Sequence, residues 1–515
     1  VRATTASMLN IEQTKLNVIA SEIGGGFGGK LGVYLEPVAL VLSKKSGRPV
    51  KMQMDRNEVF MASGPGSATR NWVKIGAKKD GTITAMEAKL CYEAGWAPGS
   101  SPLGPACMTV FTPYDVDNQY VEGYEVVVNK ARCAAYRAPG APQSEYACEM
   151  VINELADELG MDPIDLRLKN VAKEGTQTMY GPKLKAVGLV ECLEAARDSA
   201  QYKTALKENQ GRGVASGFWF NVGGESSVVI NMNEDGTGTI VEGSPDIGGS
   251  RASMQMMAAE ELQMPVEAFS AIIGDTQNLP YSNPTGGSRT TFATGMAVVE
   301  AAADVVSQLK ERAAATWNIT PEQVEWKDGK AFNTKGEGVL TAAEICGSAA
   351  KTGGHISGRG NISARGASPS FAVHLADIEV DPDTGKTTVV RYTAIQDAGK
   401  AIHPSYVEGQ YQGGSAQGIG WALNEEYVYS SDGRLENPGF LDYRIPLASD
   451  LPMIETVIVE VPNSFHPFGV RGIGETGIIP PLAACGTAVS NAIGIRMSEL
   501  PMSPPKILKA IQDAS

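Results

Sequence analysis

The loop Arg471-Gly472-Ile473-Gly474-Glu475-Thr476-Gly477 lies near the C-terminal end of the chain, ahead of Pro480, Pro481 and an apolar, Ala/Gly-rich run to Ile495. It places one carboxylate, Glu475, between glycines and just before a helix that prolines begin. Flexible backbone beside a helix N-terminus is how a general base is often held against a ligand. A plain turn with a solvated glutamate would look similar. Because four other glycine-rich loops of the chain have the same layout, we favour the general base.

The composition is that of a globular chain too long for a single core. With 515 residues, 43% hydrophobic and 20% charged, two or more domains are expected. No apolar run reaches the roughly 20 residues that a membrane-spanning helix needs. The net charge of −14 and the pI of about 5.0 argue against a nucleic-acid-binding protein, which would need a basic face.

Cysteines and histidines are dispersed, so no ligand set for a metal or a cluster is visible. The cysteines stand at positions 91, 107, 133, 148, 192, 346 and 485, and the histidines at 355, 374, 403 and 466. Without a C-x-x-C pair, neither a zinc site nor an iron–sulfur ligand set is indicated. The chain begins Val1-Arg2-Ala3, with no initiator Met and no signal peptide. We therefore expect a cytoplasmic protein that was cut or split from something longer.

Hydrophobic periodicity and turn residues predict both helices and strands. Helices are expected at 1–9, 36–45, 144–159, 189–200 and 252–262, with others ending near 309 and 422. Strands are expected at 16–19 and 125–128, and hairpins around 79–81, at 227–232 with 239–241, and at 372–380 with 387–394. Residues 95–113 are rich in Gly, Pro and Ser, and we expect them to be irregular and to line the opening of a pocket.

The four loops that share the layout of 471–477 are residues 24–30, 136–143, 244–251 and 284–291; a further glycine-rich loop is expected at 408–414. Loops at helix starts offer free backbone N–H groups and positive dipole ends. If the loops converge, they suit a large anionic ligand that carries phosphates. The alternative is that each is only a tight turn. Residues 24–30 match G-x-G-x-x-G in part and lack the ribose-binding acid, so a Rossmann site is not supported.

Hairpin, loop and helix recur in both halves of the chain. We therefore predict an α+β fold of two related mixed α/β domains with the cofactor site between them. Residues 1–205 would form the first domain and residues 206–515 the second, which carries the catalytic Glu475. The charged segment 174–212 contains the expected boundary.

The loops also resemble, in order, the signature segments of a known family. The segments are Gly24-Gly25-Gly26-Phe27-Gly28-Gly29-Lys30, Tyr136-Arg137-Ala138-Pro139-Gly140-Ala141-Pro142-Gln143, Thr285-Gly286-Gly287-Ser288, Gly409-Gln410 and Gly472-Ile473-Gly474-Glu475. They resemble the xanthine dehydrogenase / aldehyde oxidase / carbon monoxide dehydrogenase family, specifically its large subunit, which binds the molybdopterin cofactor. The resemblance covers nearly the whole chain. It implies a molybdenum-dependent hydroxylase that acts on an N-heteroaromatic compound or an aldehyde, with water as the oxygen source.

The same resemblance assigns roles to individual residues. It implies that the metal is held by the dithiolene of the pterin, near Phe27, Arg137, Gly287 and Glu475, with Glu475 as the catalytic base. The residues that it places around the cofactor are Gly26, Phe27, Gly28, Arg137, Ala138, Gly248, Gly249, Ser250, Arg251, Thr285, Gly286, Gly287, Ser288, Gln410 and Gly474. Gln410 would hydrogen-bond an oxygen ligand. The loop around Gly248 would bind the pterin or a phosphate of the cofactor. The cofactor is expected to be the molybdopterin cytosine dinucleotide.

Three departures from the family pattern reduce the range of possible substrates, and a fourth concerns the cofactor. Ala138 stands where carbon monoxide oxidisers carry Cys, so a copper-bridged site is not expected. Leu31 replaces the Glu of purine oxidisers, and Pro139 replaces a substrate-stacking Phe, so xanthine is a poor candidate. The D-I-G-Q-G loop is one residue short, and Arg251 is expected to replace its Gln.

The resemblance also implies partners. Electrons would leave through a [2Fe-2S] subunit and a FAD subunit, because this chain has no cysteine set for a cluster. Family subunits carry roughly two hundred more residues before the first loop, by the domain size such folds need. A missing N-terminal part, or a separate chain that supplies it, is therefore expected. Two alternatives stay open: a non-catalytic cofactor-binding or assembly fragment, and a hydrolase that uses Glu475 as a simple acid/base.

Overall fold

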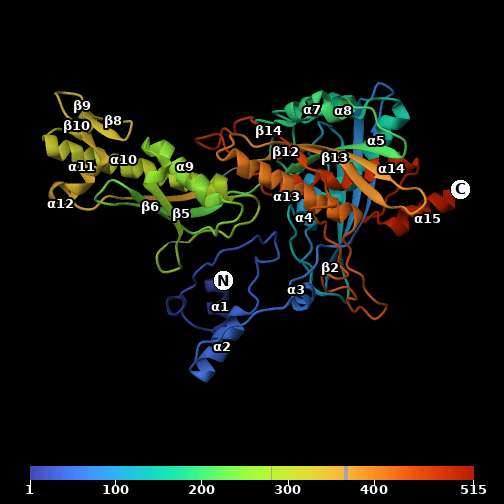
Figure 1. The fold of residues 1–515 in the computed structure, drawn as a ribbon, viewed down its shortest axis with the longest axis horizontal. Coiled ribbons are helices and arrows are strands. Elements are labelled where there is room, and N and C mark those ends of the chain that lie inside the picture. The colour runs from blue at the N-terminus through green and yellow to red at the C-terminus, as the bar shows by residue number, and fades with distance from the viewer. Residues whose placement is uncertain (280, 365–368, 515) are drawn as a thin grey trace.

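The computed structural model describes residues 1–279, 281–364 and 369–514. Within these ranges, helices pack on four β-sheets, and the α+β class is confirmed. Figure 1 shows two bodies joined side by side: one holds the strands of residues 224–364 and the other holds the remaining long strands. An N-terminal arm, blue in the figure, lies beneath them.

The N-terminal arm consists of short helices joined by extended chain. Its elements are α1 (Arg2–Leu9), a 3₁₀ turn (Gln13–Lys15), α2 (Glu36–Ser46) and α3 (Arg56–Ala62). The strand expected at residues 16–19 is wrong. Val18 exchanges hydrogen bonds only with Thr276, whose N–H donates to the Val18 carbonyl at 3.1 Å and whose Oγ1 accepts from its N–H at 2.9 Å. One residue pair does not make a ladder, so the segment stays extended without joining a sheet.

The first sheet confirms the hairpin expected around residues 79–81. Its strands are β1 (Thr69–Ala77), β2 (Ile83–Gly95) and β3 (Gln119–Val127), in the order β1-β2-β3. β1 and β2 are antiparallel, whereas β2 and β3 are parallel. A parallel pair needs a crossover, and helix α4 (Leu103–Thr109) provides part of it. We expected residues 95–113 to be irregular. That expectation is wrong in part, because α4 lies within this segment. Helix α5 (Ala141–Leu159) packs against this sheet.

The second sheet has helices on both faces. Its order is β14-β13-β12-β4, from β4 (Gln210–Trp219), β12 (Ser370–Val380), β13 (Thr387–Asp397) and β14 (Ile454–Val459). Around it lie α6 (Pro163–Asn170), α7 (Leu189–Asp198), α8 (Ala200–Lys203), α13 (Pro404–Leu423), a 3₁₀ turn (Thr476–Ile478), α14 (Pro480–Ile493) and α15 (Pro504–Ala514). The core beneath α7 joins Leu193 to Val214 and Phe371. Apolar packing thus continues across residue 205, and the domain boundary expected there stays a prediction.

The other body contains the remaining two sheets. One has the order β11-β5-β6-β7, from β5 (Gly224–Met232), β6 (Gly238–Glu242), β7 (Phe269–Ile273) and β11 (Ser357–Ala364). The other has the order β10-β9-β8, from β8 (Val324–Lys327), β9 (Lys330–Asn333) and β10 (Val339–Thr341). Its helical elements are α9 (Ser250–Leu262), 3₁₀ turns at Val266–Ala268 and Pro321–Gln323, a π-turn (Thr290–Thr294), α10 (Gly295–Trp317), α11 (Ala342–Gly347) and α12 (Ala349–Thr352).

One helical stretch of the described chain, Thr290–Trp317, is long and apolar enough to span a membrane; it consists of the π-helical segment Thr290–Thr294 and α10. More than half of its apolar stretch is buried inside the protein. Val298, Val305 and Leu309 belong to the core that also contains Met254 of α9 and Ile230 of β5. Its hydrophobicity is thus accounted for by its place as a core helix.

Residues 408–414, expected to be a glycine loop, lie inside helix α13. The expectation was wrong because Gly414, like Gly418 further along the helix, serves a helix contact and not a turn. A Cβ on Gly414 would lie 2.8 Å from the carbonyl carbon of Gly477, and one on Gly418 would lie 2.5 Å from Pro481. Missing side chains let α13 lie against the segment that follows Glu475.

Strand β4 and helix α14 meet at backbone distance. A Cβ on Gly213 would lie 1.9 Å from the Ala484 carbonyl oxygen, far inside contact distance. Small side chains on α14, including Ala484 and Ala488, complete the close approach. Because α14 directly follows the loop of Glu475, this contact fixes where that loop ends.

We predict that Gly213→Ala lowers the free energy of unfolding by about 3 kcal/mol, because the new methyl group has no room beside α14. Urea unfolding followed by circular dichroism would measure it. Gly104→Ala is the control, since a Cβ there meets no atom within 4 Å. Equal stability of the two variants would contradict the close approach of β4 and α14.

Candidate active site

Glu475 lies at the start of the 3₁₀ turn Thr476–Ile478, between β14 and α14. Its Oε1 accepts a hydrogen bond from the Ala138 N–H at 3.1 Å, and its Oε2 accepts one from Ser288 Oγ at 2.9 Å. The side chain is enclosed by protein, although part of its surface stays accessible. Burial raises the pKa of Glu475, while Ser288, Ala138 and the charge of Arg137 oppose that rise. The site thus holds an oriented carboxylate that binds a proton more readily than a free glutamate does.

The loop before α5 supplies two of these neighbours. Ala138 has φ 55°, and this left-handed backbone turns its N–H towards Glu475. Arg137 donates from its guanidinium to the Gly474 carbonyl and to Gln410 on α13. The Gln410 side-chain oxygen, expected to face an oxygen ligand, accepts from Arg137 at 3.2 Å.

The first glycine loop lies against the same arginine. The Phe27 carbonyl accepts from the Arg137 N–H at 2.9 Å, and the guanidinium lies 5.4 Å from the centre of the Phe27 ring. The ring is 44% exposed. Gly26 and Gly28 flank it, and a Cβ on Gly28 would lie 2.0 Å from the Ala135 carbonyl oxygen. The structure therefore brings Gly26, Phe27 and Gly28 into the neighbourhood of Glu475.

The loop 284–291 approaches from the other body. The Gly287 carbonyl accepts from the Val222 N–H at 2.9 Å, and Gly287 has φ 70° where a Cβ would lie 2.3 Å from Val222. Only glycine fits this close, left-handed position. Ser288, also left-handed at φ 57°, can then reach Glu475. Thr285 makes its side-chain hydrogen bond within the same loop, where its Oγ1 accepts from Thr290 Oγ1 at 3.4 Å. Gly286 follows it in the sequence and precedes Gly287.

The loop 244–251 is more peripheral. Gly248 lies next to the Gln410 side chain and Gly249 next to the Tyr406 ring, since a Cβ at either would lie within 2.7 Å of them. Ser250 Oγ donates to Asp246 at 3.3 Å.

Arg251 is paired with two carboxylates. Its Nε forms an ion pair with Asp246 at 2.9 Å, and its Nη2 forms one with Glu22 at 3.0 Å. Its N–H also donates to Asp246 at 3.1 Å, so Asp246 caps the start of α9. The N-terminus of α9 therefore already has an anionic partner.

Sequence reasoning missed two residues at the end of β4. The amide nitrogen of Asn221 donates to the Gly472 carbonyl at 2.8 Å and so joins β4 to the Glu475 loop. Trp219 is buried, and its indole N–H makes no hydrogen bond within the described chain. It lies close enough to Glu475 to lower the pKa of that carboxyl group. The signal was an aromatic run that ends in Asn directly after a strand.

The loop is anchored at its other end by a buried ion pair. Arg471 Nε lies 2.9 Å from Asp397 Oδ2, and both side chains are 0% exposed. Further donors and acceptors complete the pair: the Arg471 guanidinium donates to the carbonyls of Val461, Pro369 and Ala186, and Asp397 Oδ1 accepts from the N–H groups of Gly399 and Val461. Arg471 thus ties four separate segments to the first residue of the 471–477 loop.

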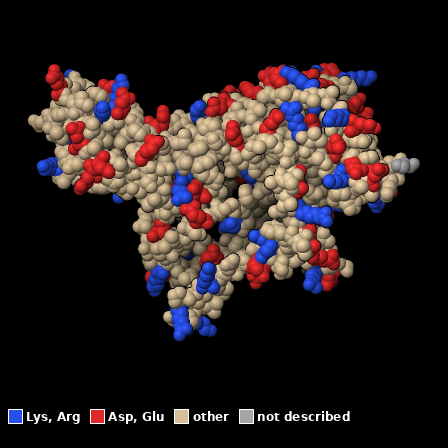
Figure 2. Space-filling view, viewed as in Figure 1, with Lys and Arg blue, Asp and Glu red and all other residues tan. Residues whose placement is uncertain are grey.

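These contacts unite segments from the whole length of the chain. Loops 24–30, 136–143, 284–291 and 471–477 contact one another around Glu475, and 244–251 reaches them through α13. Figure 2 shows the molecule hollowed between the N-terminal arm and the larger body, with both basic and acidic side chains bordering the hollow. The expected convergence of the glycine loops is therefore present in the fold, and the role of each residue stays a prediction.

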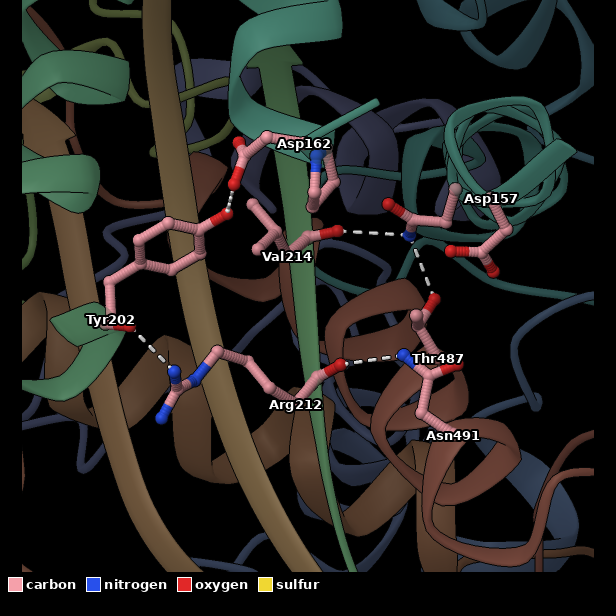
Figure 3. Close-up of a pocket in the computed structure, with 9 residues that line it drawn as sticks. Asp157, Asp162, Tyr202, Arg212, Val214, Thr487 and Asn491 are labelled. Carbon is pink, nitrogen blue, oxygen red and sulfur yellow. Dashed lines mark hydrogen bonds between the residues drawn. The ribbon is translucent and has the colours of Figure 1, made fainter. Parts of the chain in front are cut away.

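A separate pocket of about 300 Å³ lies elsewhere, between α5, α14 and the start of β4. Figure 3 shows its polar lining bonded to itself: Tyr202 donates to Asp162, and Arg212 donates to the Tyr202 carbonyl. It includes none of the predicted site residues. Its polar groups serve structure, and it is not the candidate active site.

The donor set around Glu475 fits a group that is held by backbone and neutral side chains. In the part of the chain that the structure describes, no cluster of three or more His, Cys, Asp or Glu side chains could hold a metal ion. A metal here would have to bring its own ligand, as molybdenum on a pterin does. A Cβ on Gly24 or Gly409 would meet no atom within 4 Å outside the local backbone, so there is open space beside both residues.

Comparison with known proteins supports the same kind of group. Residues 1–171 and 187–452 each match the molybdopterin cofactor-binding domain. The xanthine dehydrogenase molybdenum-binding subunit of Escherichia coli O157:H7 is 30% identical over 533 residues, which cover 98% of this chain and 71% of that protein. The aldehyde oxidoreductase molybdenum-binding subunit PaoC of the same organism is 28% identical, covering 99% and 70%. The crystal structure of quinoline 2-oxidoreductase from Pseudomonas putida 86 superposes with a TM-score of 0.90 at 25% identity, covering 100% of this chain and 71% of that chain.

Fold and loops together define a molybdopterin cofactor-binding protein. The chain belongs to the family of xanthine dehydrogenase and aldehyde oxidoreductase molybdenum-binding subunits, which are molybdenum-dependent oxidoreductases.

We predict that Arg471→Met lowers the free energy of unfolding by about 3–5 kcal/mol, because it leaves Asp397 buried without its counter-charge. Chemical denaturation would measure it, and adding Asp397→Asn should restore part of the loss. Arg391→Met is the control: its ion pair with Glu455 is exposed, and its loss should cost at most about 1 kcal/mol. Similar effects of both arginine variants would contradict the anchoring role of Arg471.

Proposed function

We propose that the chain is the catalytic subunit of a molybdenum hydroxylase, with Glu475 as the general base. The reaction would be oxidative hydroxylation of an N-heteroaromatic compound or an aldehyde, with water as the oxygen source. The observation that carries this proposal is a carboxylate oriented by donors from two other loops, Ala138 and Ser288. Relatives named for xanthine, quinoline and aldehydes support the substrate class.

The chain's own residues would prepare the base and the binding site. Burial keeps the proton affinity of Glu475 high, and the Ser288 hydroxyl and the Ala138 N–H fix the direction of its two oxygens. Phe27 would cover the reacting centre with its ring, and Gly287 would bring backbone close to it. Molybdenum on its pterin supplies the two-electron redox chemistry when bound.

The remaining predicted residues would hold the cofactor. Backbone at Gly26, Gly28, Gly286 and Gly474 would contact the pterin, and Thr285 would support that backbone. Gly248, Gly249, Ser250 and Arg251 would face its dinucleotide end, for which we propose the cytosine form. The ion pairs of Arg251 with Asp246 and Glu22 would have to rearrange before Arg251 could bind a phosphate.

Partners complete the electron path. The seven cysteines are free and offer no cluster, so we propose that [2Fe-2S] and FAD groups reside on partner subunits, in the cytoplasm. The matched relatives extend beyond this chain, which spans 71% of one of them. We propose that the rest of such a large subunit, on this or another polypeptide, joins the complex. Ala138, Leu31 and Pro139 disfavour carbon monoxide and xanthine as substrates.

We predict that Glu475→Gln retains the fold and the bound cofactor but loses at least about a hundredfold in turnover, the size of a general-base effect. Dye-linked oxidation assays with partner subunits added, together with metal analysis, would measure both. Normal molybdenum content without turnover in the unaltered protein would instead support a non-catalytic assembly fragment. Product without any electron acceptor would support a hydrolase. Turnover near normal in the variant would remove Glu475 as the base.

We predict that turnover falls on the acid side of its pH profile at a pH above the ordinary pKa of a glutamate, because burial raises the pKa of Glu475 and the base must be ionised. Ser288→Ala should move this acid limb to still higher pH. The Ser288 hydroxyl stabilises the charged carboxylate, and its loss favours the protonated form. Ser357→Ala, which removes a hydroxyl bonded to Asn231 in the other body, is the control and should leave the limb in place. A shift to lower pH in Ser288→Ala would contradict the proposed geometry.

A further inference from the structure

The guanidinium of Arg137 is turned into the protein. The residue is 4% exposed, and its donors reach three acceptor residues. Nε donates to the Gly474 carbonyl at 2.5 Å, and Nη1 donates to Gln417 Oε1 at 3.1 Å. Nη2 donates to the Gln410 carbonyl at 3.1 Å and to its Oε1 at 3.2 Å. A guanidinium has five N–H donors, so little capacity is left for another partner.

These acceptors belong to two different elements, helix α13 and the loop that carries Glu475. Gln410 and Gln417 are two helical turns apart on α13 and therefore lie on one face of it. Gly474 immediately precedes Glu475. The planar fork of Arg137 thus spans the gap between α13 and the loop that carries the base.

The backbone around Arg137 reaches the same region. The Arg137 N–H donates to the Phe27 carbonyl at 2.9 Å, and the next N–H, of Ala138, donates to Glu475 Oε1 at 3.1 Å. Side chain and backbone therefore hold Glu475 from two directions. A shift of Arg137 would move both at once.

We propose that Arg137 is a positioning residue, which fastens the Glu475 loop to α13 through its own hydrogen bonds and does not present its guanidinium to the substrate. This inference rests on the proposed role of Glu475 as the base. In this proposal Arg137 acts on the base through Gly474 and Ala138. An arginine in the wall of an active site would otherwise be expected to bind substrate.

The charge of Arg137 gives the proposal a measurable consequence. Among the described groups that act on Glu475, Arg137 is the charged one, whereas the Ser288 hydroxyl, the Ala138 N–H and the Trp219 indole are neutral. Burial lowers the pKa of Arg137 to about 10, so it remains a cation at neutral pH. Its positive charge favours ionised Glu475, and its removal should raise the pKa of Glu475.

Infrared titration of the protein without cofactor would test this directly. The C=O band of protonated Glu475 is identified by its loss in Glu475→Gln, and its pH dependence is then compared between variants. We expect Arg137→Gln to move the titration to higher pH. Arg137→Lys keeps the charge but not the fork, so its titration should stay nearer to the original while its thermal midpoint falls. Arg212→Gln is the control, because Arg212 is also largely buried and bonded to carbonyl oxygens, as well as to the Asp377 carboxylate, in another part of the protein.

If Arg137→Gln does not fold, Gln417→Leu removes one acceptor while keeping the charge. It should lower the thermal midpoint and leave the titration of Glu475 almost unchanged. An unchanged midpoint in this variant, or an unchanged titration in a folded Arg137→Gln, would overturn the proposal.

Kinetics of the complete complex would separate positioning from substrate binding. A displaced base predicts a fall in kcat of about a hundredfold in Arg137→Lys, with KM changed little, as expected for a misplaced reacting group. A rise in KM with kcat retained would overturn the proposal, because it would place the guanidinium on the substrate. The infrared result does not depend on turnover. If Glu475→Gln stays active while Arg137→Gln still shifts the titration, the general-base function fails and the positioning contact stands.

Discussion

The buried ion pair between Arg471 and Asp397 is the constraint on which the candidate site depends. Removing two charges from water is costly, and their attraction together with further hydrogen bonds offsets that cost. Here the carbonyl groups of Val461, Pro369 and Ala186 accept from the guanidinium, and two backbone N–H groups donate to Asp397 Oδ1. Asp397 Oδ2 makes no hydrogen bond within the described chain and faces the charge of Arg471 at 2.9 Å. Pro369 is 102 residues and Ala186 is 285 residues from Arg471 in the sequence, so the pair links segments that only the complete fold brings together. The start of the 471–477 loop is therefore fixed by the fold as a whole.

The end of that loop is fixed by a different kind of contact. Helix α14 lies on β4 at backbone distance, where Gly213 leaves room for Ala484. Dispersion and close fit, with no charged group involved, determine the position of α14 along β4. Glu475 lies between these two fixed ends, one held by an ion pair and the other mainly by close packing. Its carboxylate can therefore be aimed by as few as two direct hydrogen bonds, from Ala138 and Ser288.

The sequence correctly predicted the elements that depend on interactions between residues close together in the chain. The hairpin turn at 79–81, the helix after the 136–143 loop and the helix started by Pro480 all follow from turn chemistry and periodicity. The segment 408–414 was misread because a glycine that admits a neighbouring backbone, as Gly414 does, looks the same in sequence as one that makes a turn. The partners of Arg137 and Arg251 could not be read either. Gly474 is 337 residues from Arg137, and Glu22 is 229 residues from Arg251, and no local pattern encodes such pairs.

The same long-range contacts explain how the pKa of Glu475 is raised while its ionised form remains accessible. Burial alone would favour its neutral form strongly, and a neutral acid cannot accept a proton. The cation of Arg137 and the donors Ser288 and Ala138 each stabilise the ionised form, so they limit the rise in the pKa of Glu475. Arg137 contributes to this balance while also bonding α13 to the loop. Its position therefore sets both where the carboxylate lies and how readily it takes a proton, and the two properties change together when Arg137 moves.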